Sequence, residues 1–207
     1  MSLLETELYL DRASIPSARR VIEHLAQRGY SVAFFDGFDL ADEAHSFWTP
    51  VRIDGRETGF DYHVIPRAEM SKEEGWPPYD PQFGNTYLGF AARNHTGSIL
   101  AAALVQLAIC ELSDAKGAFP AAELTLQNGE MIEFLLDTVK QAESDISSSQ
   151  NISAHFLPEA PAATQGRLPE NYFSNIAKAL AGGAVAILIA AGFVFGMAQF
   201  FGSTANS

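Results

Sequence analysis

The hydrophobic pattern at the start of the chain changes from strand-like to helix-like and back. Residues 6–10 show a weak alternation of polar and apolar side chains and predict a short strand. Apolar residues then recur at helical spacing in a segment that Ser14 is placed to cap and Gly29 to end. Residues 31–35, Ser-Val-Ala-Phe-Phe, predict a buried strand.

Two strand-like runs, 47–53 and 56–65, flank the dipeptide Asp54-Gly55. Asp-Gly between such runs is a strong signal for a β-hairpin, because both turn residues must adopt positive φ. Pro50 indicates that the first run lies at a sheet edge or is broken there, since proline lacks a backbone N–H. The residues of the second run that share one face are Phe60, Tyr62 and Val64.

The pattern continues with a proline-rich loop, a strand, a helix, a short strand and a second helix, at residues 66–86, 87–93, 97–112, 121–126 and 128–142. The first of these helices is apolar enough to be the central core helix. The second is amphipathic, with an inward face of Met131, Phe134, Leu135 and Val139. We therefore predict an α+β fold, with a small mixed or antiparallel sheet and packed helices, in a soluble domain spanning residues 1–142.

The end of the chain has a different composition. Residues 143–172 are rich in Ser, Pro and Ala and predict a flexible linker. No charged side chain occurs after Lys178. Residues 180–201 are long enough as a helix, about 33 Å, to cross a hydrocarbon core of ~30 Å, and they have no polar face. We predict a C-terminal transmembrane helix within 173–202, followed by a short tail, 203–207.

The flanks of this helix predict its direction. Arg167 and Lys178 precede it and no basic residue follows, so the positive-inside rule leaves the soluble domain in the cytoplasm. The first residues do not resemble a secretory signal peptide, and the single cysteine, Cys110, fits a reducing compartment. We therefore expect a single-pass, tail-anchored membrane protein.

Small residues line two rows of the predicted transmembrane helix. Gly192 and Gly196 form a GxxxG spacing, and Gly182 with Ala186 belongs to a second row. Such rows allow close approach of two helices, either in self-association or against other membrane spans. A lipid-facing anchor made of small residues is the alternative.

The charge of the chain limits the kinds of partner it can bind. The formal net charge is −12. An acidic surface repels phosphate backbones, so nucleic-acid binding is not expected. The acidic residues Asp36, Asp39, Asp42 and Glu43 lack the order of a calcium-binding EF-hand loop. They predict either a solvated loop or a contact surface for a basic protein partner.

Aromatic residues supply candidate anchors for such a partner. Trp76 and Tyr79 lie in the proline-rich loop, and Trp48 and Tyr87 are further aromatic residues expected at the surface. Aromatic side chains commonly dominate the energetics of protein interfaces. Folding of the loop back onto the core is the alternative for Trp76.

The sequence contains no catalytic motif. The glycine-rich phosphate-binding and dinucleotide-binding motifs and Gly-x-Ser-x-Gly are absent, and the five histidines do not form metal-binding pairs. Asp61 and His63 share one strand face and, with Asp39, Asp42 and His95, are the only ligand set the sequence offers for a metal ion. We expect no cofactor and no catalysis.

Three short segments carry a family resemblance: Gly29-Tyr-Ser-Val32 after the first helix, Gly59-Phe-Asp-Tyr62 in the hairpin, and Ala101-Ala-Ala-Leu104 in the core helix. In this order, residues 15–140 loosely resemble small α+β immunity-type domains of bacterial toxin systems. Lys116-Gly-Ala-Phe-Pro120 departs from the Gly-Gly-Val and Asp-Pro-Gln pattern of such domains, and a membrane anchor is not part of it. The resemblance implies a protein that binds and blocks a toxin.

Three functional hypotheses follow. The first is a membrane-tethered, non-enzymatic binding protein whose acidic domain holds a protein partner, in the manner of a toxin-neutralising immunity factor. The second is an accessory or structural subunit of a membrane complex, packed through its single transmembrane helix. The third, and least supported, is a metal-dependent enzyme.

Overall fold

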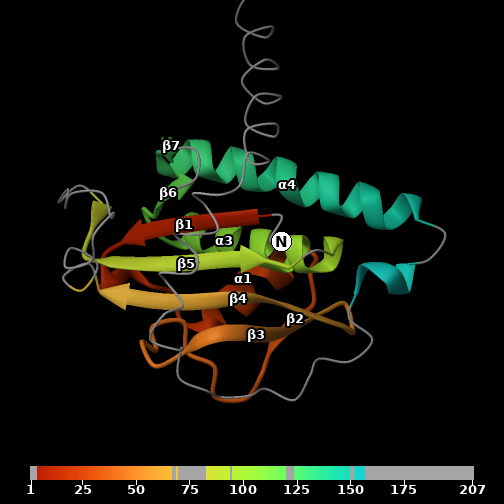
Figure 1. Cartoon of the computed structure of the whole chain (residues 1–207), viewed down its shortest axis with the longest axis horizontal. Coiled ribbons are helices and arrows are strands. Elements are labelled where there is room, and N and C mark those ends of the chain that lie inside the picture. The colour runs from red at the N-terminus through yellow and green to blue at the C-terminus, as the bar shows by residue number, and fades with distance from the viewer. Residues whose placement is uncertain are drawn as a thin grey trace, which may run out of the picture.

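A seven-stranded antiparallel sheet organises the described part of the chain, which in this computed structural model comprises residues 4–66, 69, 83–93, 95–119, 124–149 and 152–156. The strand order is β2-β3-β4-β5-β1-β6-β7, and neighbouring strands all pair antiparallel (Figure 1). The strands are β1 (Leu4–Leu10), β2 (Val32–Phe34), β3 (Ser46–Ile53), β4 (Arg56–Pro66), β5 (Thr86–Ala92), β6 (Lys116–Phe119) and β7 (Leu124–Leu126). This confirms the predicted α+β class with an antiparallel sheet.

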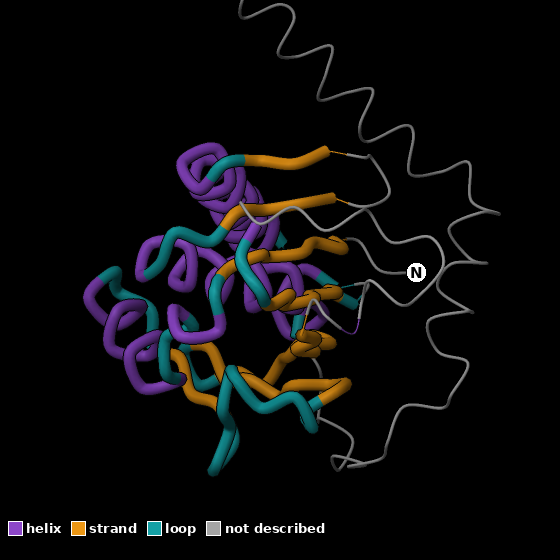
Figure 2. Tube along the Cα trace, turned by 90° about the vertical axis from the view of Figure 1, so that its left-hand side faces the viewer, coloured by secondary structure: helices purple, strands orange, loops and turns teal. Residues whose placement is uncertain are grey.

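Three helices lie on one side of the sheet, as Figure 2 shows edge-on. They are α1 (Ala18–Gln27), α3 (Thr96–Leu112) and α4 (Asn128–Ser148), and two single 3-10 turns, η1 (Arg12–Ser14) and η4 (Ile152–His155), accompany them. We call the face that the three helices cover the inner face, and the opposite face the outer face. Helix α3 contacts α1, α4, β4 and β5, so it is the central helix of the core.

The core helix is buried along almost its whole length. Every residue from Leu100 to Cys110 is buried. Its only long polar side chain in that stretch, Gln106, accepts a hydrogen bond from the Thr6 hydroxyl (2.6 Å) and donates one to the carbonyl of Ala102 (3.2 Å). Buried polar groups are tolerated when they are paired in this way.

The predicted hairpin is confirmed. Asp54 and Gly55 have φ angles of 49° and 78°, the positive values that a tight two-residue turn requires. Pro50 pairs with Gly59 of β4 and lies in the part of β3 that has no pairing with β2, as expected for an edge position.

Several element boundaries differ from the prediction. Ser17 caps α1, accepting a hydrogen bond from the N–H of Arg20 (3.3 Å), because the predicted cap, Ser14, belongs to η1. Strand β6 was not predicted, since Gly117 breaks its apolar pattern. The glycine leaves room for the Met131 side chain of α4, which a Cβ at this position would displace.

The predicted linker starts too early. Helix α4 runs six residues beyond the predicted end at Ala142, to Ser148, because Ile146 continues its buried face. The chain then returns to the domain, where Phe156 is buried against the core. The folded domain therefore includes residues 143–149 and 152–156.

The C-terminal predictions remain untested. Within the described segments, no helix combines the length and apolarity needed to traverse a bilayer. The predicted span 173–202, with Gly182, Ala186, Gly192 and Gly196, lies outside the described residues, as does most of the predicted linker.

Thr6→Val is expected to lower the free energy of unfolding by about 1–3 kcal/mol, because it leaves the Gln106 side-chain oxygen buried without its donor. Adding Gln106→Leu should recover part of this loss, since both polar partners are then absent. Urea unfolding of the full chain and its three variants measures the coupling. Additive effects of the two substitutions would contradict the pairing.

Candidate protein-binding surface: the acidic loop 35–45

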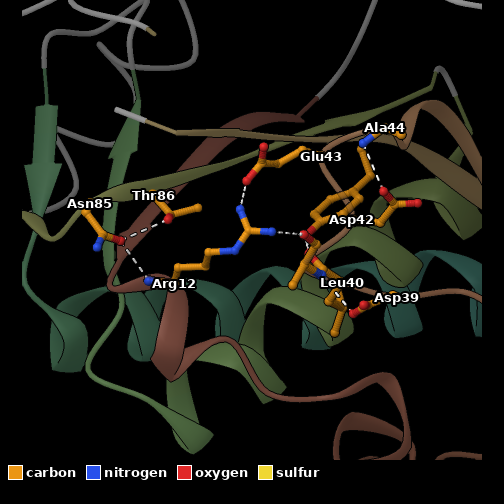
Figure 3. Close-up of polar contacts among 10 residues, drawn as sticks. Arg12, Asp39, Leu40, Asp42, Glu43, Ala44, Asn85 and Thr86 are labelled. Atoms are coloured by element: carbon orange, nitrogen blue, oxygen red, sulfur yellow. Dashed lines mark hydrogen bonds and ion pairs between the residues drawn. The ribbon is translucent and has the colours of Figure 1, made fainter. Parts of the chain in front are cut away.

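The loop that joins β2 to β3, residues 35–45, brings four of the predicted partner-binding residues together. They are Asp36, Asp39, Asp42 and Glu43, and all four are exposed. Figure 3 shows the last three of them around Arg12. The other two predicted residues, Trp76 and Tyr79, lie outside the described residues.

Two aspartates shape this acidic loop from within. A carboxylate oxygen of Asp39 accepts the N–H of Ala41 (3.0 Å), and one of Asp42 accepts the N–H of Ala44 (2.9 Å). These are Asx turns, in which a short polar side chain replaces a backbone acceptor. The backbone adds a hydrogen bond from the N–H of Asp42 to the carbonyl of Asp39 (3.2 Å). The acidic side chains are therefore structural parts of the loop as well as charges on it.

The middle of the loop is attached to the core. Leu40 is fully buried, and its carbonyl accepts a hydrogen bond from the hydroxyl of Tyr62 on β4 (2.5 Å). Burial raises the pKa of Tyr62 well above its ordinary value, so the hydroxyl keeps its proton and remains a donor. The ring of Phe38, also buried, lies edge-on to Tyr62.

Arg12 attaches the acidic loop to the segment just before β5. Its guanidinium donates to the carbonyl of Ala41 (3.1 Å) and forms an ion pair with Glu43. Its backbone N–H donates to the side-chain oxygen of Asn85 (2.8 Å), just before β5 (Figure 3). Among the described residues, Glu43 is thus the one acid of the loop that has a basic partner. Asp36, Asp39 and Asp42 remain uncompensated there.

An exposed aromatic ring accompanies these charges. The prediction placed Phe35 in a buried strand, but β2 ends at Phe34 and Phe35 is 36% exposed. Its ring stacks on His45, with 5.7 Å between ring centroids. Burial lowers the pKa of His45, against the opposing charge of Asp42, so the histidine adds no positive charge at neutral pH.

The metal ligand set considered from the sequence is dispersed. Asp61 forms an ion pair with Arg93 (2.9 Å), and His95 caps α3 by accepting the N–H of Ser98 (3.1 Å). His63 does share the outer face with Asp61, but its Nε2 lies 3.0 Å from the Tyr87 hydroxyl. Among the described residues, no three potential ligands lie close enough together to hold an ion.

The sequence reasoning missed a buried polar cluster on the outer face. Glu7 on β1 is only 8% exposed and accepts a hydrogen bond from the Tyr9 hydroxyl (2.6 Å). Tyr87, predicted to be exposed, is buried beside them. Trp48 is partly buried, with its ring over Gly59 and beneath Arg93 (4.0 Å). Strand pairing brings Glu7, Tyr9 and Tyr87 together, and pairing cannot be derived from local pattern.

Arg12→Gln is expected to loosen the acidic loop, because the substitution removes the ion pair with Glu43 and weakens the contact with Ala41. Amide hydrogen exchange of residues 39–45 in the full chain should become faster, while the free energy of unfolding changes by less than about 1 kcal/mol. Arg19→Gln on α1, where the arginine forms an exposed ion pair with Glu23, is the matched control and should leave the loop unchanged. Unchanged loop exchange in Arg12→Gln would show that the attachment is not needed.

Comparison with family models, curated proteins and solved structures returned no match to the sequence or the fold. The resemblance to immunity-type domains therefore stays a prediction. The function has to be argued from the residues of the chain itself.

Proposed function

We propose that this protein is a membrane-tethered binding protein whose acidic loop, residues 35–45, holds a basic protein partner. One observation carries the proposal: the loop has a preformed shape and presents, beside an exposed aromatic ring, three carboxylates that have no basic partner in the described segments. The three carboxylates are those of Asp36, Asp39 and Asp42, and the ring is that of Phe35.

The attachment of the loop supports this role. A surface that is ordered before binding does not lose that conformational freedom when the partner arrives, so less of the interaction energy is spent on ordering. Leu40 and Phe38 hold the loop to the core, and Arg12 holds it to the segment before β5. The exposed charges therefore stand at defined positions, which is what discrimination between partners requires.

Charge supports the chemical class of the partner. Uncompensated carboxylates on a chain of net charge −12 attract basic proteins and speed their association. Phe35 offers apolar area of the kind that anchors interfaces. In its finer form the proposal is that the partner is a basic toxin domain, which the protein neutralises by covering it. The sequence resemblance described above is what favours that form.

The composition of the tail supports the tether. Residues 180–201 contain no charged side chain and have the length of a bilayer crossing. With basic residues before this segment and none after it, the acidic loop would face the cytoplasm. The domain would then meet its partner at the inner surface of the membrane.

Neutralising the charges of Asp36, Asp39 and Asp42 should abolish partner binding. The variant Asp36→Asn/Asp39→Asn/Asp42→Asn retains the side-chain oxygens that accept the turn hydrogen bonds, so it removes charge with little change of shape. Crosslinking in source membranes followed by affinity purification should recover the wild-type partner, and the variant should retain at most about a tenth of it.

The control carries the same change of charge at a distance from the loop. Glu133→Gln/Asp137→Asn/Asp145→Asn removes three exposed acids of α4 and should bind as the wild type does. Equal recovery by the loop variant and the control, or recovery of no protein by the wild type, would contradict the proposal.

Removing the residues after Lys178 should release the domain from the membrane. The full chain is expected to remain in the membrane pellet after an alkaline carbonate wash, because a spanning helix cannot leave the hydrocarbon without exposing its apolar surface. The chain that ends at Lys178 should appear in the soluble fraction. Release of the full chain by carbonate would show that the tail does not span the bilayer.

A further inference from the structure

The outer face of the sheet carries a polar network of three buried residues and one partly buried histidine that the proposed function does not use. Its members are Glu7 and Tyr9 on β1, Tyr87 on β5 and His63 on β4. The strand register explains the cluster: Glu7 and His63 both lie opposite Gly89, and Tyr9 lies opposite Tyr87.

Tyr87 connects the carboxyl group to the imidazole. Its hydroxyl forms a hydrogen bond with Glu7 and lies 3.0 Å from Nε2 of His63. Gly89 makes this possible, because a Cβ at that position would collide with the His63 ring and with the Tyr87 hydroxyl. The imidazole therefore extends over the backbone of β5 to reach the tyrosine.

The surroundings favour neutral forms of both titratable groups. The hydrogen bonds to the Glu7 carboxyl come from two tyrosine hydroxyls, which carry no charge. Among charged residues of the neighbouring strands, Glu5 on β1 opposes ionisation of Glu7, Asp61 on β4 favours the charged form of His63, and Lys116 on β6 lies over the Phe83 ring. Burial nevertheless dominates at both sites.

Burial shifts the two groups in opposite directions. It raises the pKa of Glu7 from 4.5 to about 7, and Glu5 adds to this shift. It lowers the pKa of His63 from 6.5 to about 4, and Asp61 opposes this shift only in part. Between pH 4.5 and 6.5, each group is thus mostly uncharged in the folded chain and mostly charged in an unfolded one.

We propose that Glu7 and His63 form a compensating proton pair joined by Tyr87, in which folding moves one proton from the imidazole to the carboxyl group. In the unfolded chain at pH 5.5, the imidazole carries the proton and the carboxylate is ionised. In the folded chain the Glu7 carboxyl O–H bond is formed and the His63 N–H bond is broken. No proton is gained or lost, and a tyrosine that donates one hydrogen bond and accepts another can connect the two neutral groups.

The consequence for stability follows from the signs of the two shifts. The raised pKa of Glu7 means that its contribution to stability is present below pH 4.5 and is lost as pH rises through 7. The lowered pKa of His63 means that its contribution is present above pH 6.5 and is lost as pH falls through 4. The two effects cover nearly the same pH range and cancel between pH 4.5 and 6.5.

Single substitutions should reveal a pH dependence of stability that the two opposite pKa shifts cancel in wild type. Urea unfolding of the full chain in mild detergent gives the unfolding constant of each variant relative to wild type. For Glu7→Gln this ratio should fall about 40-fold from pH 4.5 to 6.5, and for His63→Gln it should rise about 40-fold. For the double variant the ratio should stay nearly constant. Because each value is a ratio to wild type, the effects of all other titrating groups cancel. Ratios for the single variants that do not change with pH, or a double-variant ratio that does, would overturn the proposal.

A second measurement observes the protonation of Glu7 directly in the folded chain and uses a more conservative variant. The infrared spectrum of wild type minus that of Glu7→Asp, where the shorter side chain shifts the carboxyl band, should contain the carbonyl band of a protonated carboxylic acid at pH 5.5. In wild type this band should disappear as pH rises through about 7. Its absence at pH 5.5 would show that Glu7 is ionised in the folded protein and would also overturn the proposal.

Discussion

The burial of α3 against the inner face of the sheet is the constraint on which the other features depend. A helix that is apolar on all sides has to be covered on all sides, and α1, α4 and the strands β4 and β5 together provide that cover. Because α1, α3 and α4 all gather on the inner face, the outer face can carry polar residues, and some of these form hydrogen bonds with one another across the strands. The network of Glu7, Tyr9, Tyr87 and His63 is the result.

The candidate binding loop and the outer network are both connected to one short segment, residues 85–87. Asn85 accepts a hydrogen bond from the backbone of Arg12, whose side chain holds the acidic loop, and Tyr87, two residues further along, belongs to the outer network. Gly84, before them, has a φ of 71° and lies so close to the backbone of Leu10 and Asp11 that a side chain could not fit. The start of β5 is therefore a junction with little freedom to rearrange.

The local pattern of hydrophobic and polar residues predicted most helices and strands but not which of them lie side by side. Phe60, Tyr62 and Val64 alternate and are all buried, and Asp54-Gly55 forms the expected turn, since both features depend on nearby residues. Asp36, Asp39, Asp42 and Glu43 could be predicted as one acidic surface because they lie within eight consecutive positions. The role of Arg12 could not, since it acts across 29 positions, and the pairing of Glu7 with His63 across β5 depends on strand order, which no local signal reveals.

The outer network also explains how a carboxyl group can be tolerated in the middle of a sheet. A buried ionised carboxylate whose donors among the described residues are two neutral hydroxyls would cost several kcal/mol, and removing a proton from the partly buried imidazole of His63 has its own cost at acid pH. In the proposed pair, the two groups reach a neutral state together with no net uptake or release of a proton. Replacing the pair by apolar residues would also be neutral, but it would remove the hydrogen bonds of the Tyr87 hydroxyl to Glu7 and His63. The carboxyl, the imidazole and the tyrosine therefore have to be considered as one unit, in which the loss of any member removes a hydrogen bond from another.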